Sequence, residues 1–324
     1  MKWKIEKIKD LNGFTIEWLD PKIVLFSKRN RIYRSKDPFG KREFVGEVSA
    51  PAWQKFVSRI RMGQRFLRFM AYNVIPLSDA SIFVSFNKSI GIISKEGYRD
   101  IGGIKRPHRI LRNACAVSSE GDLYWGEYID NQDRGQISIY RYTPGRNNAE
   151  EVYTFEKGEV RHIHGIYADP YTGSLWCTSG DLPHECRIIK SDDGFKTIKN
   201  VGGGDETWRA VSILFSPNFI YFANDAEFRQ NHIYRLNRTT GERTLLGDIQ
   251  GPVYYSTSLD DDLLFAVTAE LCPSQQEKAA VLYGLEQNSN IESIVSYRKD
   301  LIAKSFLVKL FLPGTLSFPS GPGT

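Results

Sequence analysis

A short motif recurs four times along the chain: a run of apolar residues that ends in a carboxylate beside small residues. The four carboxylates are Glu127, Asp181, Asp225 and Glu270, which are separated by 54, 44 and 45 residues. Repeats of ~40–45 residues that consist of strands and turns are typical of β-propeller blades. Because equivalent positions of successive blades lie side by side around one axis, we expect the four acids to face a common centre.

Further strand signals complete each repeat. After the carboxylate comes a strand such as 137–142, then a turn and a fourth strand such as 151–155. The unit is therefore a four-stranded antiparallel meander, which is the structure of a blade. Six copies of the third strand can be counted, at 31–37, 90–96, 137–145, 187–194, 232–238 and 281–284.

The two ends of the chain decide the predicted number of blades. Residues 2–9 form a strand that has no partner in the first repeat, and residues 304–324 supply two more strands. Paired together, the ends would complete a seventh blade and close the ring, which removes exposed sheet edges. We therefore predict an all-β fold, a single β-propeller domain over residues 1–324. Seven four-stranded antiparallel blades are expected, with six as the alternative.

Composition narrows the classes of partner. The chain has 43 Lys and Arg against 38 Asp and Glu, a net charge of +5 that permits an anionic partner without demanding one. Its basic residues form no stripe, so no nucleic-acid partner is expected. Neither a signal peptide nor a run of ~18 apolar residues is visible, so we expect a cytoplasmic protein with no membrane partner. The four cysteines form no C-x-x-C pair and are expected to be buried, reduced thiols.

One turn motif carries a resemblance. Ser191–Thr197 fits the Asp-box pattern S-x-D-G-x-x-T, and residues 35–40 are a looser copy with the glycine displaced. In this motif the chain resembles the sialidase-like, or BNR-repeat, propellers. The resemblance implies that the box is a structural hairpin on the outer part of a blade, far from any ligand. Turn chemistry agrees, since Asp193 can accept hydrogen bonds from turn amides and Gly194 permits a positive φ.

The catalytic signature of that family is missing here. Only Ile75 and Pro76 remain of its Phe/Tyr-Arg-Ile-Pro motif, and nothing in the sequence groups three arginines into a carboxylate clamp. A classical sialidase is therefore not expected.

The segment 161–173 is the richest in chemistry. Its two histidines, His162 and His164, are two residues apart and so project to the same side of a strand. Counting back from the carboxylates aligns His164 with Arg209 and Tyr255 in later repeats, within a residue or two. Histidine titrates near neutrality, arginine binds carboxylate or phosphate, and acids and tyrosine move protons.

These alignments yield a list of candidate site residues. We predict catalytic roles for His164, Arg209, Asp181, Asp225 and Glu270. We predict substrate contacts for Glu127, Tyr255, His162 and Trp208. Two histidines with several carboxylates could also hold a divalent metal. The competing interpretation is a scaffold, in which the same polar groups hydrogen-bond loop backbones and ordered water.

The sequence therefore supports two functional hypotheses. The first is a carbohydrate-active propeller that binds, and could cleave, an acidic sugar or glycan in its central channel. Cleavage could be that of a glycoside hydrolase or of a polysaccharide lyase, and the sequence leaves open whether the protein is an enzyme. The second is a non-catalytic propeller that serves as a scaffold for protein–protein interaction.

Overall fold

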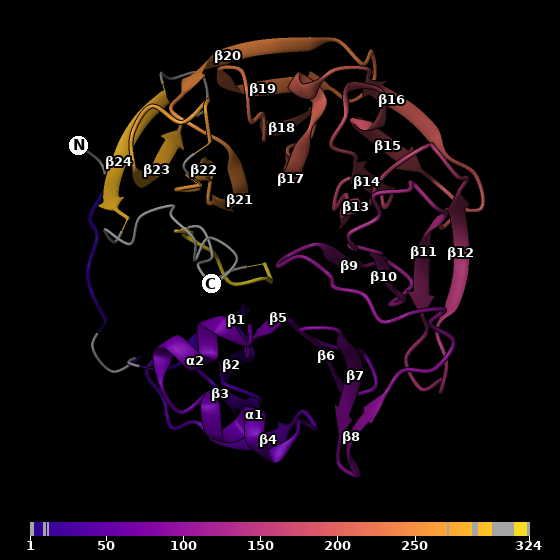
Figure 1. The fold of residues 1–324 in the computed structure, drawn as a ribbon, viewed down its shortest axis with the longest axis vertical. Helices are drawn as coiled ribbons and strands as arrows, with labels where there is room; N and C mark the ends of the chain where they lie inside the picture. The colour runs from indigo at the N-terminus through magenta and orange to yellow at the C-terminus, as the bar shows by residue number, and fades with distance from the viewer. Residues whose placement is uncertain are drawn as a thin grey trace. The chain divides into compact units, whose positions relative to one another are not determined.

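The computed structural model of this chain describes residues 3–8, 11, 13–270, 272–286, 291–299 and 314–322. Within them the strands form six four-stranded antiparallel sheets, each built from four consecutive strands (Figure 1). The fold is an all-β propeller with six blades, as in the alternative prediction, and not the seven that we favoured.

The described residues belong to two compact units. The first contains residues up to Arg109, together with residues 318–322, and holds two blades and two short helices. Its elements are β1 (Thr15–Leu19), β2 (Val24–Lys28), β3 (Arg31–Ser35), β4 (Glu43–Glu47), α1 (Ala52–Val57), α2 (Arg61–Phe66), β5 (Ala71–Pro76), β6 (Ile82–Phe86), β7 (Ser89–Ser94) and β8 (Gly97–Asp100).

The second unit begins at Ile110 and holds the other four blades, which carry the repeated carboxylates. Its first two blades are formed by β9 (Cys115–Val117), β10 (Leu123–Gly126), β11 (Ile137–Tyr142) and β12 (Glu150–Phe155), and by β13 (Ile163–Ala168), β14 (Leu175–Ser179), β15 (Arg187–Ser191) and β16 (Lys199–Gly203). The third blade is formed by β17 (Ala210–Phe215), β18 (Phe219–Asn224), β19 (Asn231–Asn237) and β20 (Arg243–Ile249). The fourth is formed by β21 (Val253–Leu259), β22 (Asp262–Val267), β23 (Ala279–Leu285) and β24 (Ile291–Arg298). Two 3₁₀ turns, η2 (Pro183–Glu185) and η3 (Glu206–Trp208), lie in the loops of this unit.

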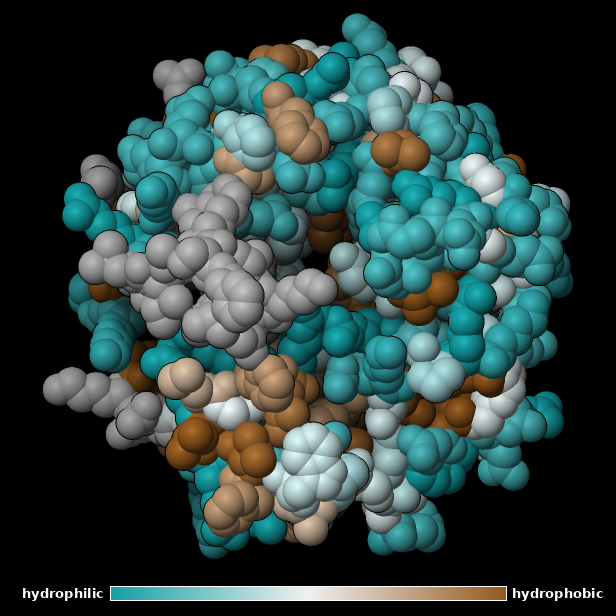
Figure 2. Space-filling view, in the orientation of Figure 1, coloured by the Kyte–Doolittle hydropathy of each residue, from teal (hydrophilic) through white to brown (hydrophobic). Residues whose placement is uncertain are grey.

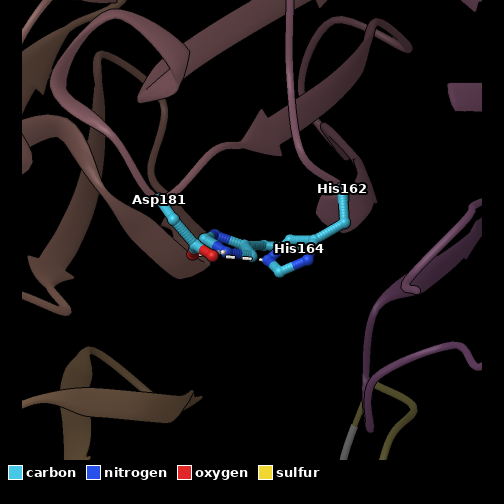
Figure 3. Close-up of side chains that lie close together, drawn as sticks. All are labelled: His162, His164 and Asp181. Carbon is cyan, nitrogen blue, oxygen red and sulfur yellow. Dashed lines mark ion pairs between the residues drawn. The ribbon is translucent and has the colours of Figure 1, made fainter. Parts of the chain in front are cut away.

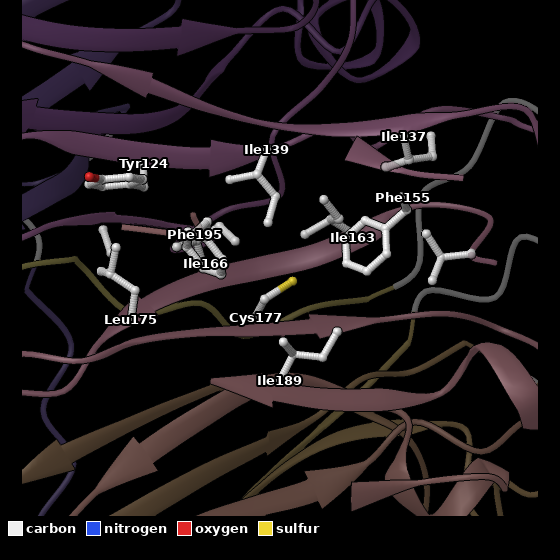
Figure 4. Packing of buried hydrophobic residues seen from close by; sticks show 12 residues of the cluster. Tyr124, Ile137, Ile139, Phe155, Ile163, Ile166, Leu175, Cys177, Ile189 and Phe195 are labelled. Carbon is white, nitrogen blue, oxygen red and sulfur yellow. The ribbon is translucent and has the colours of Figure 1, made fainter. Parts of the chain in front are cut away.

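Packing between neighbouring blades makes the core of the second unit. The second strands β10, β14 and β22 of this unit are buried along their whole length, and β18 is buried over most of it, because both faces of these strands are covered. Between the blades of β9–β12 and β13–β16, the side chains of Phe155, Ile163, Ile166 and Cys177 form one apolar cluster (Figure 4). All four cysteines are free thiols, as predicted, and three of them are buried.

The chain ends do not form the predicted seventh blade. Residues 3–8 contain no strand, and residues 314–322 contribute only isolated bridges, one of them between Ser320 and Trp18. The predicted tail strands at 304–313 lie outside the described residues. The prediction failed because β1–β4 are already a complete blade, so the N-terminal segment is not needed as a strand. The single domain predicted over residues 1–324 stays a prediction.

The Asp box is the turn between β15 and β16. Its Asp193 accepts hydrogen bonds from the amide and hydroxyl of Thr197, at 2.9 and 2.7 Å, and from the hydroxyl of Ser191. Gly194 has the expected positive φ of 72°. Since β16 is the last strand of its sheet, the box lies at the outer part of the blade, as predicted. Across the described ranges, no helix is long and apolar enough to cross a membrane.

Candidate functional site

Antiparallel pairing brings five of the predicted residues to one edge of two neighbouring blades. His162 and His164 lie at the start of β13, and Asp181 follows the end of β14, where Ile163 pairs with Ser179. The same logic holds in the next blade, where Arg209 precedes β17 and Asp225 follows β18. The strand order places β13 and β17 first in their sheets, so the two groups come from equivalent corners.

The carboxylate of Asp181 is the centre of this cluster. Its Oδ1 lies 3.3 Å from Nε2 of His162, 3.6 Å from Nε2 of His164 and 3.2 Å from a guanidinium nitrogen of Arg209. Its Oδ2 lies 2.8 Å from Arg161, which the sequence analysis did not select. Both imidazole rings point toward the carboxylate in Figure 3. We call these five residues the Asp181 cluster.

The protein backbone fixes the tautomer of both histidines. Nδ1 of His162 lies 3.2 Å from the carbonyl oxygen of Ile129, and Nδ1 of His164 lies 3.0 Å from that of Ala210. A carbonyl oxygen can only accept, so each Nδ1 carries a proton and each Nε2 is turned toward Asp181. Among the described residues, Nε2 of His162 and Oδ1 of Asp181 are buried without a hydrogen bond of good geometry. The cluster therefore presents polar atoms that a ligand could satisfy.

Burial, hydrogen bonds and neighbouring charges determine which of the central groups carry a proton. Burial raises the pKa of Asp181, but the hydrogen bonds and charges that His162 and His164 supply when they are protonated outweigh burial and hold that pKa well below its usual range. Burial lowers the pKa of His164, against the attraction of Asp181, so this imidazole is neutral near pH 7. Burial also lowers the pKa of Arg209, but the charges of Asp225 and Asp181 outweigh it and keep the guanidinium charged.

Asp225 is an acid of the opposite kind. Its carboxylate lies 3.2 Å from Arg209 and is almost fully buried. Burial raises the pKa of Asp225 to about 8; Arg209 opposes this, whereas the negative charges of Glu270 and Asp181 add to it. At neutral pH this carboxyl group therefore carries a proton, while Asp181 carries none.

Two tyrosines that we did not predict lie beside these acids. The ring of Tyr128 lies 4.3 Å from that of His162, and burial together with the charges of Asp181 and Asp225 raises its pKa to about 12. Burial and the charges of Asp225 and Glu270, with a hydrogen bond to Glu270, raise the pKa of Tyr254 well above its usual value. Glu270 is thus linked to the cluster through Tyr254 and Asp225.

The alignment had selected the neighbouring Tyr255. A bulge between Val253 and Tyr255 shifts the β21–β22 register by one residue, and Tyr255 pairs instead with Ala266. Bulges at the starts of β13 and β17 shift those strands in the same way. A local bulge has no clear sequence signal here, which is why counting back from the carboxylates missed Tyr254.

Two further predicted residues lie in packing roles. Glu127 is fully buried and accepts hydrogen bonds from the amide of Ser138 at 3.0 Å and the hydroxyl of Tyr140 at 3.4 Å, both in its own blade. Trp208 stacks on Phe222, with ring centroids 6.0 Å apart, and the guanidinium of Arg243 lies 4.0 Å above its ring. The structure thus brings together five of the nine predicted residues directly, and Glu270 through Tyr254.

The same cluster could hold a metal ion in principle. The ligand atoms of His162, His164 and Asp181 all lie within 4.8 Å of one another. Two imidazoles and a carboxylate suit zinc and other transition metals, and the backbone carbonyls on both Nδ1 atoms are typical of the outer shell of such sites. The guanidiniums of Arg161 and Arg209 oppose this, because both already neutralise Asp181 and repel a cation.

Comparison with known proteins shows the fold and no family. No family of known sequences matches the chain, and no curated protein does. Solved structures match throughout most of the chain. A catalytically inactive virginiamycin B lyase from Staphylococcus aureus, solved with quinupristin, is 17% identical over 89% of this chain and 84% of its own, with a TM-score of 0.55.

Two further structures are similar at lower identity. Puromycin hydrolase is 10% identical, with a TM-score of 0.58 over 90% of this chain and 46% of its own. The extracellular domain of BT4673 from B. thetaiotaomicron is 7% identical, with a TM-score of 0.56 over 87% of this chain. This chain spans about a third of the length of that domain and about half of the hydrolase. At such identities the similarity shows a β-propeller and nothing finer.

Proposed function

We propose that the Asp181 cluster binds an anionic small molecule or glycan and can cleave it by proton transfer. One observation carries this proposal. Two buried histidines, each locked by a backbone carbonyl, aim their Nε2 atoms at a single oxygen of Asp181. A scaffold does not require two imidazoles converging on one oxygen, whereas converging titratable groups are typical of reaction centres.

The arginines would bind the anionic group. Arg161 and Arg209 keep 25% and 18% of their side-chain surface exposed, so an incoming carboxylate or phosphate can reach them. Arg161 also contacts Asp130 at 2.8 Å and Arg209 also contacts Asp225 at 3.2 Å. A guanidinium has five N–H donors, so a ligand can share it with these carboxylates. Asp181 then acts as the fixed counter-charge that orients both arginines.

The neutral and protonated groups supply a base and an acid. His164 is neutral with Nε2 unprotonated, so it can accept a proton from water or from a carbon next to the ligand's carboxylate. Asp225 carries a proton near pH 7 and can donate it to the leaving oxygen. Attack by water gives hydrolysis, and loss of the carbon-bound proton gives elimination. In both reactions one proton is taken up by His164 and one is released by Asp225.

The structural neighbours support such chemistry at the level of the fold alone. The similar structures include a hydrolase and a lyase, and the lyase is inactive as a histidine-to-alanine variant.

Binding to a panel of uronic-acid and sialic-acid oligosaccharides tests the proposal. We expect His164→Ala and Arg209→Ala to remain folded and to weaken binding at least tenfold, with poor rescue by Arg209→Lys, because a point charge does not reproduce a two-pronged contact. His232→Ala is the matched control, since His232 pairs with Asp248 on an outer strand away from the cluster. Folded variants with unchanged binding would remove the cluster from the site, and unfolding of both would favour the scaffold hypothesis.

The pH dependence of turnover tests the assigned acid. Because burial raises the pKa of Asp225 to about 8, we expect activity to fall as the pH rises through 8 and the acid loses its proton. Asp225→Asn should be inactive at every pH. Chelation and re-addition of zinc form the parallel arm, and a zinc requirement would assign the histidines to a metal instead.

A further inference from the structure

The connection between β4 and β5 exposes an unusual amount of apolar surface. Five large side chains within 14 residues of α1, α2 and the turn between them are 58–68% exposed: Trp53, Phe56, Ile60, Met62 and Phe66. Figure 2 shows apolar side chains gathered on the face that α1 and α2 occupy. Contiguous exposed apolar surface of this kind marks an interaction site. We call residues 52–66 the helical insert.

The helical insert contributes little to the core of its unit. Helix α1 contains no buried residue, and α2 contains only Gly63. A Cβ at Gly63 would lie 2.0 Å from the carbonyl oxygen of Val57, so the two helices are held in close contact at this glycine. The insert is therefore a defined structure whose large apolar side chains face outward. Packing within the unit does not account for these apolar residues.

The charge of the insert is one-sided. Between Val48 and Ser78 the sequence has five cations and no acid: Lys55, Arg59, Arg61, Arg65 and Arg68. Lys55 is neutralised by Glu47 at 2.8 Å, whereas the side chains of Arg59, Arg61 and Arg65 are exposed. Cations therefore alternate with the apolar side chains along the insert.

We propose that the helical insert binds the surface of an anionic lipid bilayer. Trp53, Phe56 and Phe66 would enter the boundary between headgroups and acyl chains, and the arginines would contact lipid phosphates. The five cations without an acid between Val48 and Ser78 match an anionic bilayer, whose surface presents negative headgroups directly above apolar acyl chains. A bilayer accepts both kinds of side chain at one depth. The earlier expectation of no membrane partner considered only segments that span the bilayer, and surface binding needs none.

Co-sedimentation with lipid vesicles tests this proposal. We expect the whole protein to bind vesicles of phosphatidylcholine with 30% phosphatidylserine and to be released from them by 0.5 M salt. Pure phosphatidylcholine should bind much less. Each exposed cation adds ~1 kcal/mol near an anionic surface, so Arg59→Gln/Arg61→Gln should weaken binding ~25-fold. The double variant Trp53→Ser/Phe66→Ser should abolish vesicle binding, because it removes the apolar anchors.

Matched controls separate this surface from general charge. Lys157 and Lys199 are exposed in the second unit, so Lys157→Gln/Lys199→Gln removes the same charge and should bind normally. All variants should keep the wild-type melting temperature, because the altered side chains are exposed. Equal binding to uncharged vesicles, or equal loss in the lysine control, would overturn the proposal. So would stronger binding to soluble polyglutamate than to vesicles, which would indicate an acidic protein partner.

Discussion

Glu127 and Asp181 hold the same place in successive blades and do different things. Each follows the second strand of its blade, after β10 and β14 respectively. Glu127 accepts hydrogen bonds from Ser138 and Tyr140 of its own sheet. Asp181 instead collects two histidines and two arginines, one of which comes from the following blade. Equivalent positions in a repeat thus share a location and not a role.

The residue before each acid explains the difference. At Glu127 the backbone continues the ladder, since its amide donates to the carbonyl of Ser138 at 3.1 Å. Before Asp181, Gly180 has a φ of 87° and turns the chain out of the strand. A Cβ at Gly180 would lie 2.0 Å from the backbone of Glu185, so only glycine fits there. Because Gly180 has a positive φ, the chain leaves the sheet before Asp181.

The buried carboxylate of Glu185 then fixes the released loop. It accepts hydrogen bonds from the amides of Asp181 and Leu182 at 3.1 and 3.2 Å and from Arg134 at 2.7 Å. Neither Glu185 nor Arg134 was a sequence candidate, because their roles depend on a loop geometry that no motif announces. Glu185 holds the backbone at Asp181 directly, and Arg134 holds Glu185.

A substitution that removes the turn at Gly180 should have the largest effect, because this turn separates the role of Asp181 from that of Glu127. Gly180→Ala combines a positive φ with a backbone clash, so we expect the free energy of unfolding to fall by at least ~3 kcal/mol. Ligand binding should be lost even where the variant is folded, since Asp181 is displaced. Chemical denaturation and binding on the same preparation measure both. Gly158→Ala is the control: its φ is also positive, at 92°, but a Cβ there meets nothing within 4 Å. It should cost only ~1 kcal/mol, and equal losses in the two variants would refute the role of the clash.

Loosening the loop should have an intermediate effect. Glu185→Ala leaves two amides and Arg134 without their acceptor, so we expect a loss of ~2–3 kcal/mol in stability and weaker ligand binding. Burial raises the pKa of Glu185, but the hydrogen bonds from Arg134 and the two amides outweigh it and lower that pKa. This stabilisation is therefore complete above the ordinary pKa of glutamate, ~4.3, and is lost as the pH falls below it. A double-mutant cycle with Arg134→Ala measures the coupling, and a coupling of zero would contradict the assigned pair.

Substitution of Glu127 should have the smallest effect on stability and no effect on ligand binding. Glu127→Gln keeps the shape and one acceptor oxygen, so we expect stability to fall by ~1–2 kcal/mol. Ligand binding should match the wild type, because the substitution keeps the backbone, and the side chain of Glu127 hydrogen-bonds Ser138 and Tyr140 of its own blade. A folded Glu127→Gln variant that loses binding would return this residue to the functional site.

The sequence alone determined the four-stranded build of the blades, although not their number, and the main members of the cluster. Alternating apolar residues and turn residues at a regular period specify antiparallel meanders, because both signals are local. The same local pairing puts the start of one strand beside the end of the next, so His162, His164 and Asp181 could be expected to meet. The repeat predicted in the same way that Arg209 and Asp225 lie on the same face as His164 and Asp181, because they hold the equivalent positions in the next blade.

Only the tertiary structure decided how these side chains are used. A bulge selected Tyr254 over Tyr255, and a glycine with positive φ separated Asp181 from Glu127. The backbone carbonyl that fixes His164 belongs to β17, the first strand of the next blade, and no pattern within the histidine's own repeat could specify it. Burial, hydrogen bonds and neighbouring charges, which depend on all neighbours at once, then gave two aspartates at equivalent positions of successive blades opposite protonation states.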